Sequence, residues 1–348
     1  MTVYAQRRRK LLAAAKGKQV VALTPANLFY LTDFFGGGVG IVHPDRTVVV
    51  TYPLEADRAE EACAEAEIVV VKKRAEMGKA LAKQLRKGGV VVDQIQRGLK
   101  AGRFEEKPEL FLETRRFKDA VERDRIKEAC ARTDRVFRVL EEELKPGRSE
   151  WELAAEVMRS ATEQEMAPTG SDSSIGPVII ASGPHGAYGH SELSKRKVKS
   201  GDFVVADLLF RYQGYNSDET RTFAVGNVTP EMKKAYAVVK EGQQAAIDAV
   251  REGVTCGSVH DAAVGVLRRH RMDRYLNHSV GHGVGIDIHE QPGIFHGNPV
   301  ELGKNDVITD EPGVYLVGKF GVRIEDTLRV DRKPELYTKF TKDLVTCG

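Results

Sequence analysis

The chain has 348 residues, of which 41% are hydrophobic and 30% are charged. A domain usually contains roughly 100–200 residues, so this composition describes about two globular domains and excludes disordered and collagen-like chains. Lys and Arg (53) nearly balance Asp and Glu (50), for a formal net charge of +3. That charge is too small to draw the protein to phosphate as a whole, so we expect no nucleic-acid partner.

The start of the chain is basic, but no run approaches the roughly 18 apolar residues of a membrane span. Residues 7–10 (RRRK) lead only into Leu11–Ala15, about half the length of a signal-peptide core. We therefore expect a cytoplasmic protein with no membrane partner. Four cysteines lie far apart in the sequence, which predicts small buried side chains rather than a disulfide framework or a zinc site: Cys63, Cys130, Cys256 and Cys347.

The first third of the chain alternates short β-rich runs with polar stretches rich in Ala, Glu and Lys, which predicts an α/β layer. The expected strands are 19–23, 47–51, 68–71 and 90–92, and the expected helices are 54–67 and 74–87. The glycine cluster at 36–40 lacks the spacing of a dinucleotide-binding loop, and no helical pattern follows it. We expect a loop or hairpin there.

From residue 119 onward the pattern favours longer helices mixed with strands, which predicts an α+β domain. The first expected helix, 119–143, is amphipathic, and Pro146 and Gly147 end it. Ser149 is then expected to cap a helix at 151–166, with Glu152 completing a capping box. Further helices are expected at 230–251 and 258–271, and β-rich runs at 178–181, 203–210, 220–225 and 314–330.

Two acids lie in a β-rich segment: Asp207 inside an apolar run, and Asp218 11 residues later. A tight hairpin with Tyr212 and Gln213 at its tip would place the two acids directly opposite each other, with Cβ atoms about 4.5–5.5 Å apart. Two like charges at that separation repel strongly unless a cation lies between them. The alternative is a pair of acids in a turn that simply reach water.

A second acidic pair repeats this arrangement. Glu311 and Glu325 are 14 residues apart, and their midpoint is Gly318, the residue type that a three-residue hairpin loop favours. These carboxylates would again face each other. Four acids on two hairpins form an oxygen-rich cage, which suits a pair of divalent ions better than one.

Histidines in Gly-rich or irregular sequence supply nitrogen ligands. In Gly281–His282–Gly283 the glycines let backbone approach closely and expose the imidazole. His289 follows seven residues later, so the chain must bend near 283–285 if both histidines serve one site. Any one of these histidines could instead be a satisfied structural group. The segment 289–293 (HEQPG) is not H-E-x-x-H, which excludes a single-zinc metalloprotease of that type.

The candidate ligands offer one nitrogen and four carboxylates, a hard set that favours Mn, Co(II), Zn or Fe(II) over metals bound by thiolates. This set resembles the metal site of the Xaa-Pro peptidase family, the pita-bread metallopeptidases that include prolidase, aminopeptidase P and methionine aminopeptidase. The resemblance rests on the segments 215–222 (YNSDETRT), 280–285 (VGHGVG) with His289 and Glu290, 311–313 (EPG) and 322–326 (VRIED). The spacings of 11 and 14 residues match the Xaa-Pro branch.

The resemblance implies a fold: a smaller α/β N-terminal, creatinase-like domain over 1–115 and an α+β pita-bread catalytic domain over 116–348. It also implies that Asp207 binds one of two divalent metal ions, that Asp218 and Glu325 bridge both, and that His282 and Glu311 complete the ligands of the other ion. A hydroxide bridging the ions would attack the peptide carbonyl before proline, and Glu311 would shuttle the proton.

The resemblance further assigns residues that touch the substrate. His190 and His289 match histidines that stabilise the oxyanion or hold the peptide backbone. His278, Arg323 and Tyr212 match pocket-lining positions, and Thr222 matches a residue that orients a ligand carboxylate from behind.

The implied activity is hydrolysis of the bond before proline in short peptides, by an Xaa-Pro dipeptidase or an Xaa-Pro aminopeptidase. The resemblance also implies a homodimer in which the N-terminal domain of one subunit shapes the other's pocket. Gly189 replaces a common proline before His190, and Gly293 replaces an arginine with which some dipeptide-cleaving relatives clamp the substrate carboxylate. The alternatives are a hydrolase or lyase of this scaffold acting on a non-peptide small molecule, and a non-catalytic binding protein.

Overall fold

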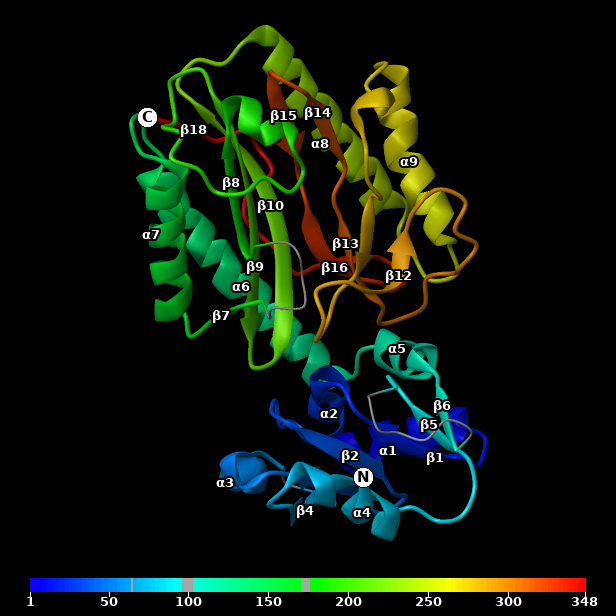
Figure 1. The fold of residues 1–348 in the computed structure, drawn as a ribbon. Helices are drawn as coiled ribbons and strands as arrows, with labels where there is room; N and C mark the ends of the chain where they lie inside the picture. Colours follow the sequence, from blue (N-terminus) through cyan, green and yellow to red (C-terminus); the bar gives the residue numbers. More distant parts are fainter. Residues whose placement is uncertain (64, 96–102, 170–175) are drawn as a thin grey trace. The chain divides into compact units, whose positions relative to one another are not determined.

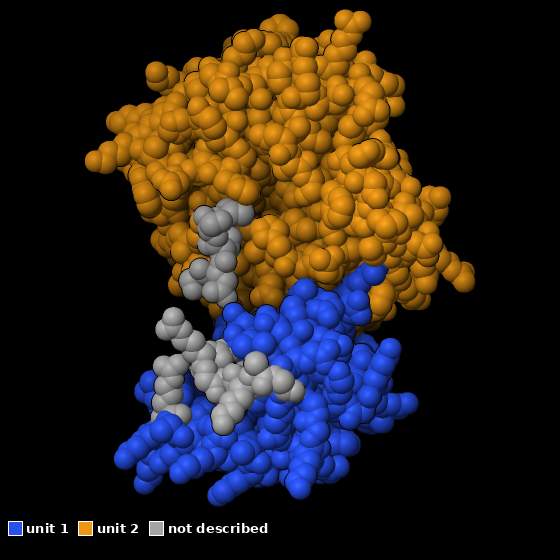
Figure 2. Space-filling model, turned by 45° about the vertical axis from the view of Figure 1, so that its right-hand side comes forward, with its two compact units in different colours: residues 1–116 blue, residues 117–348 orange. Residues whose placement is uncertain are grey.

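The computed structural model describes residues 1–63, 65–95, 103–169 and 176–348. The chain forms two compact units, residues 1–116 and 117–348, which are coloured separately in Figure 2. The division lies one residue beyond the expected domain boundary. Within the described residues, no helix is both long enough and apolar enough to cross a membrane.

The first unit is built on a six-stranded sheet with the order β4-β3-β2-β1-β5-β6 (Figure 1). Its strands are β1 (Gln19–Ala22), β2 (Gly38–Val42), β3 (Thr47–Thr51), β4 (Ala66–Val70), β5 (Val90–Val92) and β6 (Phe104–Glu106). Its helices are α1 (Val3–Ala14), α2 (Pro25–Thr32), α3 (Pro53–Ala62), α4 (Arg74–Gln84) and α5 (Pro108–Arg116). The glycine cluster enters β2, which pairs antiparallel with β3, so this segment forms the expected hairpin.

Both faces of this sheet are buried because β3 alternates its side chains between two apolar clusters. Val48 and Val50 pack with Leu81 and Leu85 around α4, whereas Val49 packs with residues near α2 and α3. The expected helix at 54–67 is shorter, since α3 ends at Ala62 and the chain extends again into β4. The basic, Ala-rich start forms α1, and α2 is a further helix that the sequence patterns had not predicted.

The second unit opens with two helices whose caps follow the sequence. Asp119 caps α6 (Ala120–Glu143), and Ser149 caps α7 (Glu150–Glu163). The Ser149 hydroxyl accepts a bond from the Glu152 N–H at 3.3 Å, and Glu152 Oε2 accepts one from the Ser149 N–H at 2.6 Å. The predicted capping box is therefore confirmed.

In the described part of this unit, two five-stranded sheets, a two-stranded sheet and four helices form the body. The first sheet has the order β18-β10-β9-β7, with β8 also paired to β9; the second has the order β12-β11-β13-β16-β17, and β14 pairs with β15. The first sheet contains β7 (Ala167–Pro168), β8 (Val178–Ser182), β9 (Phe203–Tyr212), β10 (Tyr215–Val225) and β18 (Thr346–Cys347). The others are β11 (Gly281–Gly283), β12 (Glu290–Ile294), β13 (Val307–Asp310), β14 (Gly313–Leu316), β15 (Phe320–Arg323), β16 (Asp326–Arg329) and β17 (Glu335–Leu336).

Helices cover the outer faces of these strands, which leaves the inner faces for the site (Figure 1). Helices α6 and α7 pack on β8, β9 and β10 through a cluster that includes Phe137, Val157 and Phe223. Helices α8 (Pro230–Ala249) and α9 (Cys256–Arg269) pack together and on the second sheet, where Ile247 and Val259 lie in one apolar cluster with Ile308 of β13. Short 3-10 turns lie at Gly183–Ala187 (η1) and Asp273–Tyr275 (η2).

Candidate metal centre

The hairpin formed by β9 and β10 brings Asp207 and Asp218 to one face of the sheet. Its pairing differs from the predicted one, because Asp207 lies opposite Thr220 and Asp218 lies opposite Leu209. The turn is made by Gln213 and Gly214, both with positive φ (46° and 84°), one residue later than expected. The change in register is even, so the two acids are diagonal neighbours on the predicted face instead of directly opposed.

The hairpin that carries Glu311 and Glu325 has the predicted register. Gly313 pairs with Arg323 across β14 and β15, and Asp310 pairs with Asp326 across β13 and β16. Both ladders give the same alignment, which places Glu311 opposite Glu325 at the junction between them. Gly318 has φ +78° in the loop, as the three-residue turn requires.

The bend that the two histidines need is present. Gly281 and Gly283 approach neighbouring backbone so closely that a Cβ atom would lie 2.2 Å from a carbonyl oxygen in each case. Beyond them the chain turns, and the rings of His282 and His289 come to 4.4 Å between centroids. Glu290 holds this turn: Oε1 accepts bonds from the N–H groups of residues 286 and 287, and Oε2 pairs with buried Lys118 at 2.9 Å.

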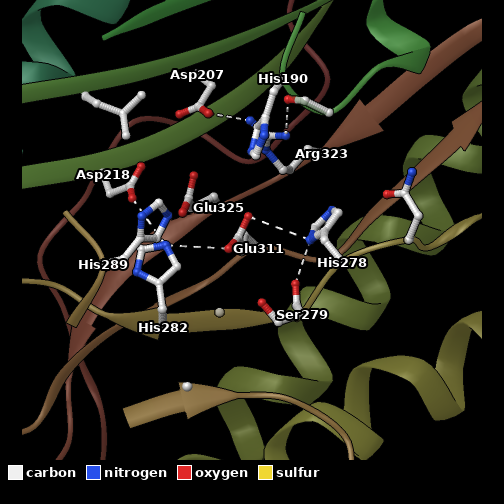
Figure 3. A pocket seen from close by; sticks show the side chains of 15 residues that line it. His190, Asp207, Asp218, His278, Ser279, His282, His289, Glu311, Arg323 and Glu325 are labelled. Atoms are coloured by element: carbon white, nitrogen blue, oxygen red, sulfur yellow. Dashed lines mark hydrogen bonds and ion pairs between the residues drawn. The ribbon is translucent and has the colours of Figure 1, made fainter. Parts of the chain in front are cut away.

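Five predicted ligands surround one cavity of about 420 Å³ (Figure 3). His282 Nε2 lies 3.5 Å from Asp218 Oδ2 and 3.6 Å from Glu311 Oε1. Asp207 Oδ2 accepts a hydrogen bond from Arg323 Nη2, while the buried Oδ1 of Asp207 has no hydrogen-bond partner. Glu325 Oε2 accepts a bond from the Thr220 hydroxyl at 2.7 Å.

Burial and mutual repulsion disfavour the charged forms of these ligands. Burial, with the negative charges of its neighbours, raises the pKa of Asp218 and of Glu325 well above the ordinary range, and burial raises the pKa of Glu311 to about 8. Burial also lowers the pKa of His282 to about 3. The neutral imidazole places Nδ1 3.0 Å from the Gly283 carbonyl, which leaves the Nε2 lone pair facing the acids.

Arg323 builds one wall of the cavity. Its Nη2 donates to Asp207, Nη1 donates to the Gly189 carbonyl at 3.0 Å and to Tyr315 Oη at 3.1 Å, and Nε donates to the Thr220 hydroxyl at 3.0 Å. The side chain is 4% exposed, so every nitrogen is used inside the protein. It therefore serves as a fixed positive charge beside the acids.

Two comparisons with known families cover nearly the whole chain. Residues 124–332 match metallopeptidase family M24, and residues 5–122 match the creatinase/prolidase N-terminal domain. The chain belongs to metallopeptidase family M24. The predicted fold, a creatinase-like domain followed by a pita-bread domain, is thereby confirmed, as is the resemblance to the Xaa-Pro branch.

Relatives within M24 include peptidases from bacteria and archaea. The chain is 31% identical to an Xaa-Pro dipeptidase of Pyrococcus furiosus over 338 residues, 94% of this chain and 95% of the relative. It is 37% identical to the probable dipeptidase PepE of Mycobacterium tuberculosis over 217 residues, 62% of this chain, and so spans only 56% of that relative. An Xaa-Pro dipeptidase from Bacillus anthracis has the same fold, with a TM-score of 0.89 at 27% identity over 99% of both chains.

M24 enzymes use divalent metal ions, and the residues present here fit such ions. The free, buried Oδ1 of Asp207 points to an absent partner, because an orphaned carboxylate oxygen is costly inside a protein. Ligand atoms of Asp218, His282 and Glu325 lie within 4.8 Å of one another. A positive ion among them would reverse the electrostatic penalty that raises the pKa of the acids.

The residues predicted to contact substrate fall into two groups. His190, His278, His289 and Arg323 line the cavity, as predicted. His190 and His289 are exposed toward it, whereas His278 is held by Tyr315 Oη at 2.8 Å from Nε2. Tyr212 was wrongly predicted to line the pocket. It lies at the end of β9, where its ring packs 3.8 Å from the guanidinium of Arg132.

Thr222 was also assigned the wrong contact. Its hydroxyl donates to the Arg323 carbonyl at 2.9 Å and accepts from the Arg323 N–H at 3.1 Å, so it fixes backbone and not a carboxylate. Thr220 makes the predicted kind of contact, since it donates to Glu325. Thr220 and Tyr315 were both missed. Thr220 follows Asp218 by two residues on β10, a period-two signal that could have found it, whereas Tyr315 lies on β14, beyond the strand break at Glu311.

Glu150 is a further residue that sequence reasoning missed. This fully buried carboxylate accepts from the N–H and hydroxyl of Ser182 at 2.8 and 2.7 Å, and from the N–H and hydroxyl of Ser194 at 3.0 and 2.7 Å. His185 Nδ1 lies 3.3 Å from it. These bonds fasten both ends of the segment that presents His190 to the cavity.

Proposed function

We propose that this protein is a two-metal Xaa-Pro peptidase that cleaves the peptide bond before proline. The observation that carries the proposal is the convergence of Asp207, Asp218, His282, Glu311 and Glu325 on one cavity, with an unpartnered oxygen on Asp207. Similarity to relatives named Xaa-Pro dipeptidase supports the substrate class.

When bound, two divalent ions lower the pKa of a water molecule to supply a nucleophile at neutral pH and polarise the scissile carbonyl. We propose that Asp207, Asp218, His282, Glu311 and Glu325 would hold these ions. His282 is ready for this role, because Nδ1 faces the Gly283 carbonyl and Nε2 is directed into the cavity. This hard donor set accommodates Mn, Co, Zn and Fe ions.

Glu311 is the proposed proton shuttle. Burial raises its pKa to about 8 in the metal-free protein, and a bound cation would lower this pKa so that the carboxylate can accept a proton. It would take the proton from the attacking water and deliver it to the proline nitrogen that leaves. The exposed imidazoles of His190 and His289 line the same cavity, where they can donate hydrogen bonds to the developing oxyanion and to the peptide backbone.

Arg323 and Gly293 favour peptides that continue beyond proline. Among the described residues that line the cavity, Arg323 is the one side chain with a permanent positive charge, and Asp207, Thr220 and Tyr315 already occupy it. Gly293 offers no side chain to the substrate carboxylate. A dipeptide would thus place its terminal carboxylate where this chain supplies no free cation. A longer peptide has no carboxylate at that position, so its binding avoids the cost of burying an unpaired charge.

A substrate-length series tests the proposal. Hydrolysis of Xaa-Pro, Xaa-Pro-Yaa and matched peptides with alanine in place of proline is measured with Mn, Co or Zn supplied in turn. We expect cleavage of the proline peptides alone, with kcat/KM higher for Xaa-Pro-Yaa. Cleavage of both series alike, or of neither while metal is bound, would reject the proposal in favour of a non-peptide substrate or a binding role.

We also propose a homodimer, on the resemblance alone, with the N-terminal domain of one subunit shaping the other's pocket. Sedimentation of the active protein tests this. A fully active monomer would be inconsistent with a pocket that needs two subunits.

A further inference from the structure

Two histidines and an aspartate converge on the surface of α9, outside the candidate metal centre. His260 and Asp261 are neighbours in the second turn of this helix, and His296 lies in the turn that follows β12. His260 Nδ1 lies 3.1 Å from Asp261 Oδ1, and His296 Nδ1 lies 2.8 Å from the same oxygen. One ligand atom from each residue falls within a group no wider than 4.8 Å.

The backbone that carries His296 is fixed to α9. The Gly257 N–H donates to the Asn298 carbonyl at 2.9 Å, and a Cβ at Gly257 would meet the Asn298 backbone at 3.0 Å, so glycine permits this close approach. Asn298 is buried, and its Nδ2 donates to the Gly293 carbonyl at 2.6 Å. The turn is therefore held in place, and the three side chains converge without a change in the backbone.

The spacing of the three side chains matches that of metal ligands. Two atoms bound to one ion at about 2.1 Å lie about 3.0 Å apart at a right angle and about 3.4 Å apart at the tetrahedral angle. The separations of 3.1 and 2.8 Å already fall near these values. Asp261 Oδ1 is common to both contacts, so an ion bound to this oxygen and to the two Nδ1 atoms can replace the protons that lie between them.

We propose that His260, Asp261 and His296 bind a borderline divalent transition-metal ion such as Ni²⁺, Zn²⁺ or Cu²⁺. Two imidazoles and one carboxylate favour these ions, whereas the carboxylate-rich cavity accommodates harder ones such as Mn²⁺. The side chains of His260, Asp261 and His296 are 12%, 54% and 80% exposed. The mostly buried His260 therefore forms the base of the site, and the other two leave it open to solvent, with room for water ligands.

This surface site is connected to the proposed active site through one residue. Asn298 ties the turn of His296 to the carbonyl of Gly293, and Gly293 lines the cavity. An ion at the surface site would brace the outer side of the turn whose inner side forms part of the pocket wall. Excess metal in an assay could thus act at a place distinct from the catalytic ligands.

The test is Ni²⁺ binding to full-length, metal-free protein, followed by titration calorimetry without substrate. The background variant Asp218→Asn weakens the candidate catalytic centre, and His296→Ala or Asp261→Asn is then added; both added changes are at exposed side chains. His270→Ala is the matched control, because His270 caps the C-terminal end of α9 and is half-exposed beside Glu241.

We expect Asp218→Asn and its His270→Ala derivative to bind one Ni²⁺ per chain at the surface site. Adding His296→Ala or Asp261→Asn should weaken this binding at least about tenfold, since loss of a ligand costs no less than loss of the groups that orient one. Equal Ni²⁺ affinity in all four variants would overturn the proposal, as would no Ni²⁺ binding in Asp218→Asn. Neither result depends on peptidase activity, so this test and that of the proposed function fail separately.

Discussion

Replacing Asp218 by asparagine should make the protein more stable than wild type without metal and less stable than wild type with metal. In the metal-free protein, Asp218 is 3% exposed, and burial together with Glu325 raises the pKa of its carboxyl well above the ordinary range. Each unit of such a rise corresponds to about 1.4 kcal/mol of stability lost once the group ionises. Asparagine keeps the shape and removes the charge.

The expected gain for metal-free Asp218→Asn is about 1–3 kcal/mol, which corresponds to roughly 2–4 °C per kcal/mol in a unit of this size. With Mn²⁺ the order should invert. Wild type gains about 2.7 kcal/mol when the free ion stands at 100 times its dissociation constant, whereas the variant has lost a proposed bridging ligand and gains less.

Thermal unfolding in chelator and in Mn²⁺ measures both effects, with peptide hydrolysis followed in parallel. The exposed Asp57→Asn is the control for a generic loss of charge and should leave both curves unchanged. The reasoning fails if Asp218→Asn is less stable than wild type in chelator, or if the two proteins gain equally from Mn²⁺. Retained turnover in the variant would separately refute the proposed role of Asp218.

Three further predictions follow from other contacts. The pKa of Glu311 is about 8 in the metal-free fold, against 4.5 ordinarily. The stability that this group contributes is therefore complete below pH 4.5 and is lost, by up to about 5 kcal/mol, as pH rises through 8. Denaturant unfolding in chelator measures this, and stability that rises over the same pH range would contradict it. Glu150→Ala should lower stability by about 3 kcal/mol and raise KM by releasing the segment of His190, with Glu150→Gln recovering part of both; unchanged KM would argue against the positioning role. Gly321→Ala should cost about 3 kcal/mol or more by urea unfolding, because its Cβ would lie 1.7 Å from the Gly186 carbonyl; a fully stable variant would show that this contact can relax.

The sequence predicted most of the fold, and the five candidate ligands meet at one cavity, because local rules and tertiary structure agree at those places. The hairpin of Glu311 and Glu325 was correct in register, since loop length and Gly318 together determine which residues pair. The other hairpin was misplaced by one residue at its turn, although Gly214 marked a position that favours positive φ. Asp207 and Asp218 still lie on the predicted face of the sheet, because side chains alternate between the two faces every two residues.

Contacts between distant segments were beyond sequence reasoning. The turn between His282 and His289 depends on Glu290 and on its ion pair with Lys118, 172 residues away. Neither residue carries a local signal for that pairing. Tyr212 and Thr222 were misassigned for a related reason: the strand pattern gives the face of a side chain, but its partner depends on which element packs there.

The junction at Glu311 and Glu325 has an implication for how this scaffold can vary. Ladders on both sides of the junction give the same alignment, and the backbone N–H groups of the two glutamates bond to Val280 and Thr220 of other segments, at 2.7 and 3.0 Å. The orientation of both carboxylates therefore does not depend on the end of the hairpin, where Val317 is 74% exposed. We expect relatives of this protein to tolerate insertions at the end of this hairpin. A reporter peptide grafted there should leave the proposed metal ligands undisturbed.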